Sequence, residues 1–117
     1  MRKRLSDKER LGFMLDNIDE LQTAFAKISY EDYTKDILIK HGITKLLQNI
    51  CETSIYITDE TKLNYPAIEW RMMRTMRNVL IHEYFGIDFQ VVWDTAVNAI
   101  PKLKIEILKI LAESFGE

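Results

Sequence analysis

The sequence is poor in the residues that cross-link chains or interrupt helices. Its 117 residues include one cysteine, two prolines and four glycines. A single cysteine, Cys51, excludes an internal disulfide and argues against a cysteine-based metal site, so we expect a reducing, cytoplasmic setting. The scarcity of glycine and proline, together with 47% hydrophobic and 29% charged residues, is typical of a compact, helix-rich protein.

Further absences narrow the function. No window approaches the roughly 20 apolar residues of a membrane span, and no apolar run follows the basic start MRKRLSDKER, so we expect neither a span nor a signal peptide. The net charge of −2 argues against a protein that coats nucleic acid, so any such role must be local. Because the sequence has no HExxH, CxxC or glycine-rich phosphate loop, we expect no metal and no cofactor.

What the sequence does contain is apolar residues at helical spacing. No segment shows the period-two alternation of a strand, so the spacing predicts one all-α domain over residues 1–117, built as a four- to five-helix bundle. The expected helices cover residues 7–28, about 29–58, 69–85, a segment capped by Asp88, and a segment after Pro101.

Glycine and proline locate the expected interruptions. Gly42 is interpreted as a kink or short break in the second helical region. The polar stretch DETKLNYPA is expected to form a turn, with Pro66 as the first residue of the next helix. Pro101 is expected to force a kink or a restart, because it cannot donate an interior hydrogen bond.

The helix over residues 69–85 includes the stretch RNVLIHEYFG and separates into two faces. At roughly 100° per residue, one arc is apolar and is expected to face the core: Met72, Met73, Met76, Val79 and Leu80. The opposite arc carries Arg71, Arg74, Arg77, Asn78 and His82. A solvated helix face is the simplest interpretation, but such faces usually intersperse glutamate with arginine, and here no acidic residue lies between Arg71 and Glu83.

Arg77 and His82 suggest a site shared between two chains. They are five residues apart, so their side chains leave the helix axis roughly 140° from each other. They could hardly converge on one substrate within a single helix, whereas two antiparallel copies would interleave them in one groove. The spacing therefore favours a composite site at a homodimer interface.

These residue types suit phosphodiester transesterification without a metal. One histidine would deprotonate a ribose 2′-hydroxyl, a second would protonate the leaving oxygen, and arginine would stabilise the charge that develops on phosphorus. His82 is the acid–base candidate, and Arg77 is the candidate phosphate ligand.

The motif R-x4-H-x-Y, formed by Arg77, His82 and Tyr84, resembles that of the HepT-like branch of the HEPN superfamily. YPAIEWR before the motif and YFGID, VVW and IPKLK after it follow that family's pattern, and NICET and the first helix extend the similarity over nearly the whole chain. The resemblance implies a HEPN-type up-and-down bundle that dimerises through the motif-bearing helix. It also implies a metal-independent endoribonuclease that acts on RNA.

The same resemblance implies roles for particular residues. Arg77 and His82 would be the catalytic pair, with Asn78 in support. HepT-like proteins are commonly the toxin of a type II/VII-like toxin–antitoxin pair whose antitoxin is a minimal nucleotidyltransferase. Tyr84 matches the position to which that antitoxin attaches AMP, which silences the toxin.

Several interpretations stay open. Arg71 and Arg74 would either bind RNA phosphates or belong to a solvated face, and Glu52 would either order the site's arginines or lie on the surface. His41 is expected at the surface or a helix end, and Trp70 and Trp93 in packing. The alternative function is a non-catalytic HEPN module that binds a nucleotidyltransferase partner.

Overall fold

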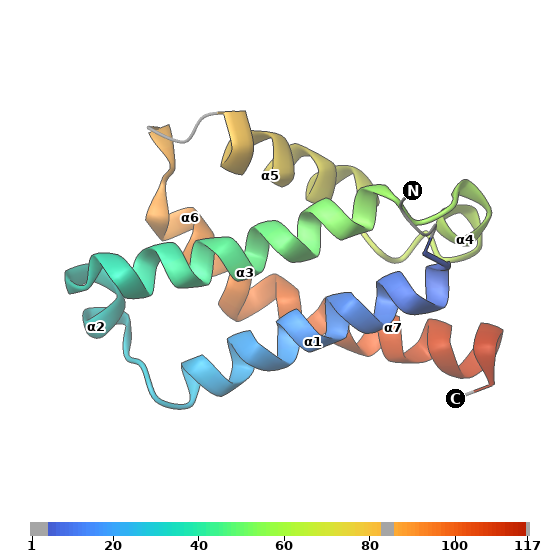
Figure 1. Ribbon diagram of the computed structural model, residues 1–117, viewed down its shortest axis with the longest axis horizontal. Helices are drawn as coiled ribbons and strands as arrows, with labels where there is room; N and C mark the ends of the chain where they lie inside the picture. The colour runs from blue at the N-terminus through green and yellow to red at the C-terminus, as the bar shows by residue number, and fades with distance from the viewer. Residues whose placement is uncertain (1–4, 83–85, 117) are drawn as a thin grey trace.

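In a computed structural model, which describes residues 5–82 and 86–116, four long helices form an up-and-down bundle (Figure 1). α3 packs between α1 and α5, and α7 packs against α1. No residue of these ranges lies in a strand, so the predicted all-α fold is confirmed. The long helices are α1 (Asp7–Phe25), α3 (Ile37–Ile55), α5 (Trp70–His82) and α7 (Ile100–Phe115).

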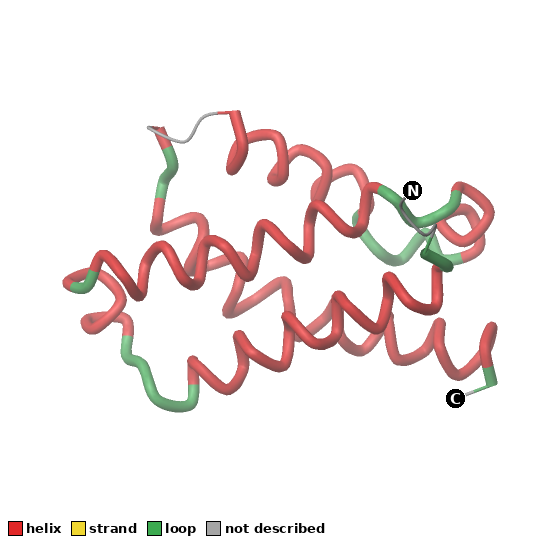
Figure 2. Tube along the Cα trace, in the orientation of Figure 1, coloured by secondary structure: helices red, strands yellow, loops and turns green. Residues whose placement is uncertain are grey.

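Short elements connect the long helices. Figure 2 shows that the loops between the described elements are short. The connecting elements are α2 (Tyr30–Lys35), α4 (Asp59–Asn64), α6 (Phe89–Asp94) and a π-helical turn, η2 (Thr95–Ala99). No helix of the described part of the chain is both long enough and apolar enough to cross a membrane.

The core lies where the long helices meet. Most of its fully buried side chains come from the apolar stripes of α1, α3 and α7, which is what the three- and four-residue spacing predicts. They include Leu11, Met14, Ile18, Leu21, Leu47, Ile50, Ile107 and Ile110. A second group of packed rings closes one end of the bundle around Trp93, whose ring lies 4.8 Å from that of Tyr33 and 4.9 Å from that of Phe25.

Local capping signals fix most helix starts. Ser6 and Glu9 form a reciprocal capping box at α1, and the carboxylate of Asp88 accepts from the backbone N–H groups of Gln90 and Val91 at α6, as expected. The C-terminal boundaries were predicted less accurately. α1 ends at Phe25 instead of 28, and α3 ends at Ile55 instead of about 58.

The predicted kink at Gly42 is wrong. Gly42 lies inside α3, and the break falls six residues earlier, at Asp36. The Asp36 carboxylate accepts from the backbone N–H groups of Leu38 (2.9 Å) and Ile39 (3.3 Å), so it caps α3 and ends α2 at the same point. A helical glycine costs only about 1 kcal/mol relative to alanine, a cost that the packing of a long helix readily offsets.

The expectation for residues 59–67 is also wrong in two respects. Residues 59–64 form α4 and not a turn, because the Thr58 hydroxyl caps it by accepting from the Thr61 backbone N–H. Pro66 lies in a turn and does not start α5, which begins at Trp70. The indole of Trp70 donates to the Tyr65 carbonyl (3.1 Å), and Ile68 is buried, so the turn is held against the core.

Pro101 produces a restart, as predicted. The chain passes from α6 into the π-helical turn η2, where the backbone N–H of Ile100 donates to the Thr95 carbonyl five residues back. A wider turn before Pro101 accommodates the missing donor and the bulk of the proline ring. α7 then continues from Ile100 as a regular helix.

Candidate active site

α5 presents the predicted polar strip to solvent. Arg71, Arg74, Asn78 and His82 are exposed, whereas Leu80 on the opposite side is 2% exposed. Met73 and Met76 are half-buried and pack against the core. One residue of the expected core face was placed wrongly: Met72 is 62% exposed, because it lies at the edge of the apolar arc.

Arg77 lies on the flank of α5 that faces α3. Its Nε donates to Glu52 Oε2 and its Nη2 donates to Glu52 Oε1 (3.4 Å), so the carboxylate holds one edge of the guanidinium. Both side chains are only partly exposed, at 26% for Arg77 and 32% for Glu52. The hydrogen bond to Glu52 raises the pKa of Arg77 above its ordinary value, which keeps the guanidinium charged. Of the two roles considered for Glu52, the structure supports the ordering of Arg77.

Asn78 completes the environment of this arginine. Its Oδ1 accepts from Arg77 Nη1 at 3.1 Å. Among the described residues, the hydrogen bonds to Glu52 and Asn78 use three of the five N–H groups of the guanidinium. The two other N–H groups, one on each terminal nitrogen, are the donors with which a phosphate could pair.

His82 lies on the other flank of the strip, at the last residue of α5. It is exposed and lines an open depression of about 350 Å³ together with Thr75, Asn78 and Val79. Arg77 does not line this depression. Within one chain, then, the structure brings Asn78 close to both Arg77 and His82 but holds those two apart, as their roughly 140° separation predicts.

The other candidate residues of the sequence analysis lie on the strip, outside the described residues, or in α3. Arg74 and Arg71 are exposed about one turn and about two turns before Arg77, on the same strip. Tyr84 lies outside the described residues, so its role stays a prediction. His41 is half-buried in α3, with its ring edge-on to Phe89 at 5.7 Å, and no group of three or more metal-ligating side chains occurs in residues 5–82 and 86–116.

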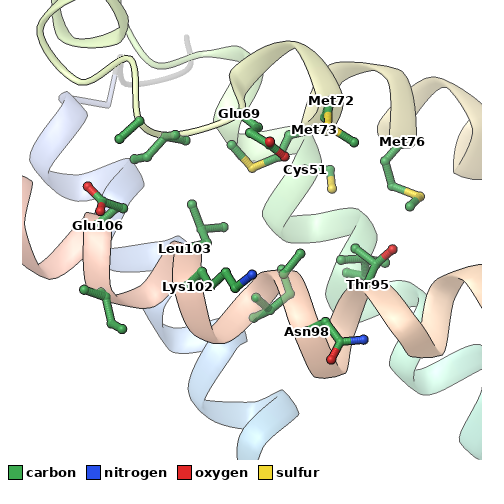
Figure 3. A pocket seen from close by; sticks show the side chains of 16 residues that line it. Cys51, Glu69, Met72, Met73, Met76, Thr95, Asn98, Lys102, Leu103 and Glu106 are labelled. Carbon is green, nitrogen blue, oxygen red and sulfur yellow. The ribbon is translucent and has the colours of Figure 1, made fainter.

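A separate apolar cavity of about 610 Å³ lies between α5, α3 and the start of α7 (Figure 3). Met72, Met73 and Met76 line one side, and Cys51 of α3 and Leu103 of α7 face them. Burial raises the pKa of the Cys51 thiol to about 12, so it stays a thiol at neutral pH and is not a nucleophile. Glu69, Lys102 and Glu106 also line the cavity, whereas no arginine or histidine of the strip does.

The sequence analysis missed two residues, Tyr56 and Arg10, that contact each other at the C-terminal end of α3. Tyr56, which caps the C-terminus of α3, is 55% exposed. Arg10 of α1 donates from Nη1 to the Tyr56 carbonyl (2.8 Å), and its guanidinium carbon lies over the Tyr56 ring, 5.7 Å from the centroid. The position of Tyr56 four residues after Glu52 was a usable signal, but nothing in the sequence connects Arg10 to it.

Comparison with known proteins finds one family over most of the chain. The family model for "Ribonuclease HepT-like" proteins matches residues 14–110. A protein of Thermococcus cleftensis named "Probable ribonuclease HepT" is 35% identical over 99 residues, which are 85% of this chain and 90% of the relative. A protein of Methanocaldococcus jannaschii named "Putative RNase MJ1380" is 30% identical over 106 residues, which are 88% of this chain and 97% of the relative. No solved structure was found to match significantly.

The chain thus combines an all-α bundle, an Arg–His strip on one helix, and a family match over most of its length. The chain belongs to the HepT-like ribonuclease family. The resemblance inferred from the motif is confirmed, and membership places the chain among enzymes of the ribonuclease class.

Proposed function

We propose that the protein is a metal-independent endoribonuclease that cleaves RNA by attack of a ribose 2′-hydroxyl on the adjacent phosphate. The observation that carries the proposal is the Arg77 guanidinium, which Glu52 holds on one edge while donors on its terminal nitrogens can meet a phosphate. His82, exposed on the same helix, supplies the acid–base group. Family membership supports RNA as the substrate.

In the proposed reaction His82 takes the proton of the 2′-hydroxyl as the oxygen attacks phosphorus. The new P–O2′ bond forms while the P–O5′ bond breaks, which leaves a 2′,3′-cyclic phosphate on one product. The departing 5′-oxygen takes a proton from a second histidine, His82 of a second copy. Arg77 stabilises the extra negative charge on the phosphate oxygens in the transition state.

A homodimer paired through α5 supplies the second histidine. The separation of Arg77 and His82 on opposite flanks of α5 supports this arrangement, because a two-fold axis perpendicular to α5 would pair two antiparallel copies of the strip and bring each residue toward the other type. The exposed Met72, beside the apolar cavity, gives such a pairing a surface to cover.

The ribonuclease proposal is tested by incubating the purified protein with RNA in excess EDTA. Wild type and a His41→Ala variant should cleave, whereas His82→Ala should lose at least about a hundredfold in rate, because general acid–base catalysis typically contributes 10²–10⁴-fold. Equal cleavage by wild type and His82→Ala, or a loss of cleavage on adding EDTA, would contradict the mechanism.

We further propose that the enzyme is a cytoplasmic toxin of a type II/VII-like pair, with a minimal nucleotidyltransferase as antitoxin. The R-x4-H-x-Y motif and family membership support this assignment. Expression of the protein alone should arrest growth, and His82→Ala should relieve the arrest. Growth arrest by His82→Ala at equal protein levels would instead favour a non-catalytic module.

AMP transfer to Tyr84 is the proposed means of silencing. The motif places Tyr84 two residues after His82, where AMP would add bulk and negative charge beside the histidine. After co-expression with the nucleotidyltransferase, intact-mass measurement should show added AMP on wild type and not on Tyr84→Phe. The same modification on the Phe variant would remove Tyr84 as the acceptor.

A further inference from the structure

We propose that Tyr56 stacks on a base of the RNA next to the phosphate bound by Arg77, and that Arg10 supports its ring from α1. The inference rests on the proposed ribonuclease function, because it assigns a substrate contact to the same site. The proposed subsite has an aromatic surface for a nucleobase. It lies beside the phosphate site, which requires a cation.

The geometry of α3 places the ring near Arg77. Tyr56 follows Glu52 by four residues, and its backbone is still helical (φ −89°, ψ −1°), so the two side chains lie on the same side of α3, roughly one turn and 6 Å apart along the axis. Glu52 is the residue that holds Arg77. A nucleotide whose phosphate pairs with Arg77 therefore has the ring of Tyr56 within reach of a neighbouring base.

Electrostatics is consistent with this proximity. The pKa of Arg77 is raised chiefly by its hydrogen bond to Glu52, against an opposing effect of desolvation, and Tyr56 adds a smaller contribution in the raising direction. A phenol far from the guanidinium would have no such effect, because charge interactions weaken with distance and with screening by water.

The ring is accessible and braced. Tyr56 is 55% exposed. Arg10 lies over the ring at 5.7 Å from its centroid and bonds the Tyr56 carbonyl at 2.8 Å, so both the backbone and the side chain are tied to α1. A ring held from one face and exposed elsewhere offers a preformed stacking surface.

The chemistry of this cluster fits single-stranded RNA. Proteins bind single strands by combining cationic groups along the backbone with aromatic side chains on which bases stack. Arg10 and Arg77 supply the cations, and Tyr56, at the C-terminal end of α3, supplies the aromatic surface. Since every base has a π-face, stacking of this kind would tolerate many sequences.

The test combines binding and cleavage. A fluorescently labelled 2′-O-methyl RNA, which cannot undergo 2′-hydroxyl attack, reports affinity by anisotropy, and unmodified RNA in EDTA reports KM and kcat. The proteins compared are wild type, Tyr56→Leu, Tyr56→Phe, Arg10→Gln and the control Leu38→Ala. Leu38 is 80% exposed and lies at the opposite end of α3, so its variant removes exposed apolar surface away from the proposed subsite.

Tyr56→Leu should weaken RNA binding by about 5- to 150-fold, the range that loss of one base–aromatic stack implies. It should raise KM by a similar factor with little change in kcat. Tyr56→Phe, which keeps the ring, and Leu38→Ala should behave as wild type. Arg10→Gln should weaken binding and reduce its salt dependence, because a cation near the strand is lost.

The outcomes separate this inference from the proposed function. If wild type cleaves RNA and Tyr56→Leu binds and cleaves equally well, the stacking role is wrong and the ribonuclease proposal stands. A fall in kcat at unchanged KM, with a lowered melting temperature, would show a structural role and overturn the inference. If wild type neither binds nor cleaves RNA, both are overturned.

Discussion

Arg77 depends for its position on Glu52, a residue from a different helix. An arginine side chain has many rotamers, and the two-point contact with the Glu52 carboxylate selects one of them. This contact joins α3 to α5, so the position of the Arg77 guanidinium depends on how the two helices pack. Glu52 is therefore a positioning residue, since it acts on the phosphate only through Arg77.

Glu52→Gln tests this positioning role. Glutamine keeps the size and one acceptor oxygen but loses the charge and the two-point contact, so we expect kcat to fall on the order of ten- to a hundredfold, the scale of loss seen when a reacting group is misplaced. Thermal stability should change little, because the pair is partly exposed to solvent.

Glu31→Gln is the matched control for that measurement. Glu31 forms an exposed ion pair with Lys35 on α2, so its loss should leave kcat unchanged. A Glu52→Gln enzyme with wild-type kcat, or a fall shared by both variants, would argue against positioning.

At the scale of residues, angular placement could be predicted and contacts between helices could not. The 100° advance per residue correctly placed Arg77 and His82 on different flanks and Leu80 in the core. The angular argument did not predict the exposure of Met72. The burial of a residue at the edge of an apolar arc depends on its distance from the neighbouring helix. Arg10, which contacts Tyr56, and Glu52, which holds Arg77, each lie on a different helix from the residue they contact, so the role of Glu52 stayed open.

At the scale of elements, Asp7 joins two helices at one end of the bundle. Its carboxylate on α1 accepts from the backbone N–H of Thr58 (3.1 Å) and from the hydroxyls of Thr58 and Thr61 on α4 (both 2.6 Å). Partial burial acts to raise the pKa of Asp7, but these hydrogen bonds outweigh it, and the pKa is lowered from its ordinary value of 3.8.

Asp7→Asn should therefore destabilise the fold in a pH-dependent way. The folded-state pKa is depressed, so the carboxylate contributes stability that is fully present above about pH 3.8 and is lost as the pH falls through the folded-state pKa. We expect a loss on the order of 0.5–1 kcal/mol at pH 7, since the group is largely solvated.

Denaturant unfolding from pH 7 down to the acid range measures this difference. The wild-type and Asp7→Asn curves should converge below pH 3.8, and Asp16→Asn, which removes an exposed carboxylate from the same helix, should stay close to wild type throughout. Parallel curves for wild type and Asp7→Asn across the whole range would contradict the role of the charge.

The same scale shows why some elements were predicted well. Caps at Ser6 and Asp88 depend on residues two or three positions away, so the sequence contains all that is needed. α4 depends on Thr58, which is itself bonded to Asp7 51 residues earlier, and the sequence pattern therefore suggested a turn. The sequence pattern favoured a break at Gly42, whereas the break lies at Asp36, whose side chain caps α3.

At the scale of the whole molecule, the proposed site is complete only in a pair of chains. If two copies of His82 act in one groove, a fixed amount of wild type mixed with a ninefold excess of His82→Ala should lose activity. Random exchange leaves about one tenth of wild-type chains in wild-type dimers, so cleavage should fall to about one tenth.

Native mass spectrometry would confirm that the subunits exchange, and saturating RNA would prevent the variant from sequestering substrate. Unchanged activity after exchange would mean that each chain carries a complete site. It would also contradict the second-histidine role in protonating the leaving oxygen.

The central claim, attack by the 2′-hydroxyl without a metal, is tested most directly by product analysis. An RNA oligonucleotide is cleaved in EDTA, the cleavage site is mapped, and the same oligonucleotide is prepared with a 2′-deoxynucleotide on the 5′ side of that bond. Mass spectrometry should find a 2′,3′-cyclic phosphate and a 5′-hydroxyl from the RNA, and no cut at the deoxy position. Cleavage of the deoxy bond, or products with 3′-hydroxyl and 5′-phosphate ends, would contradict the account.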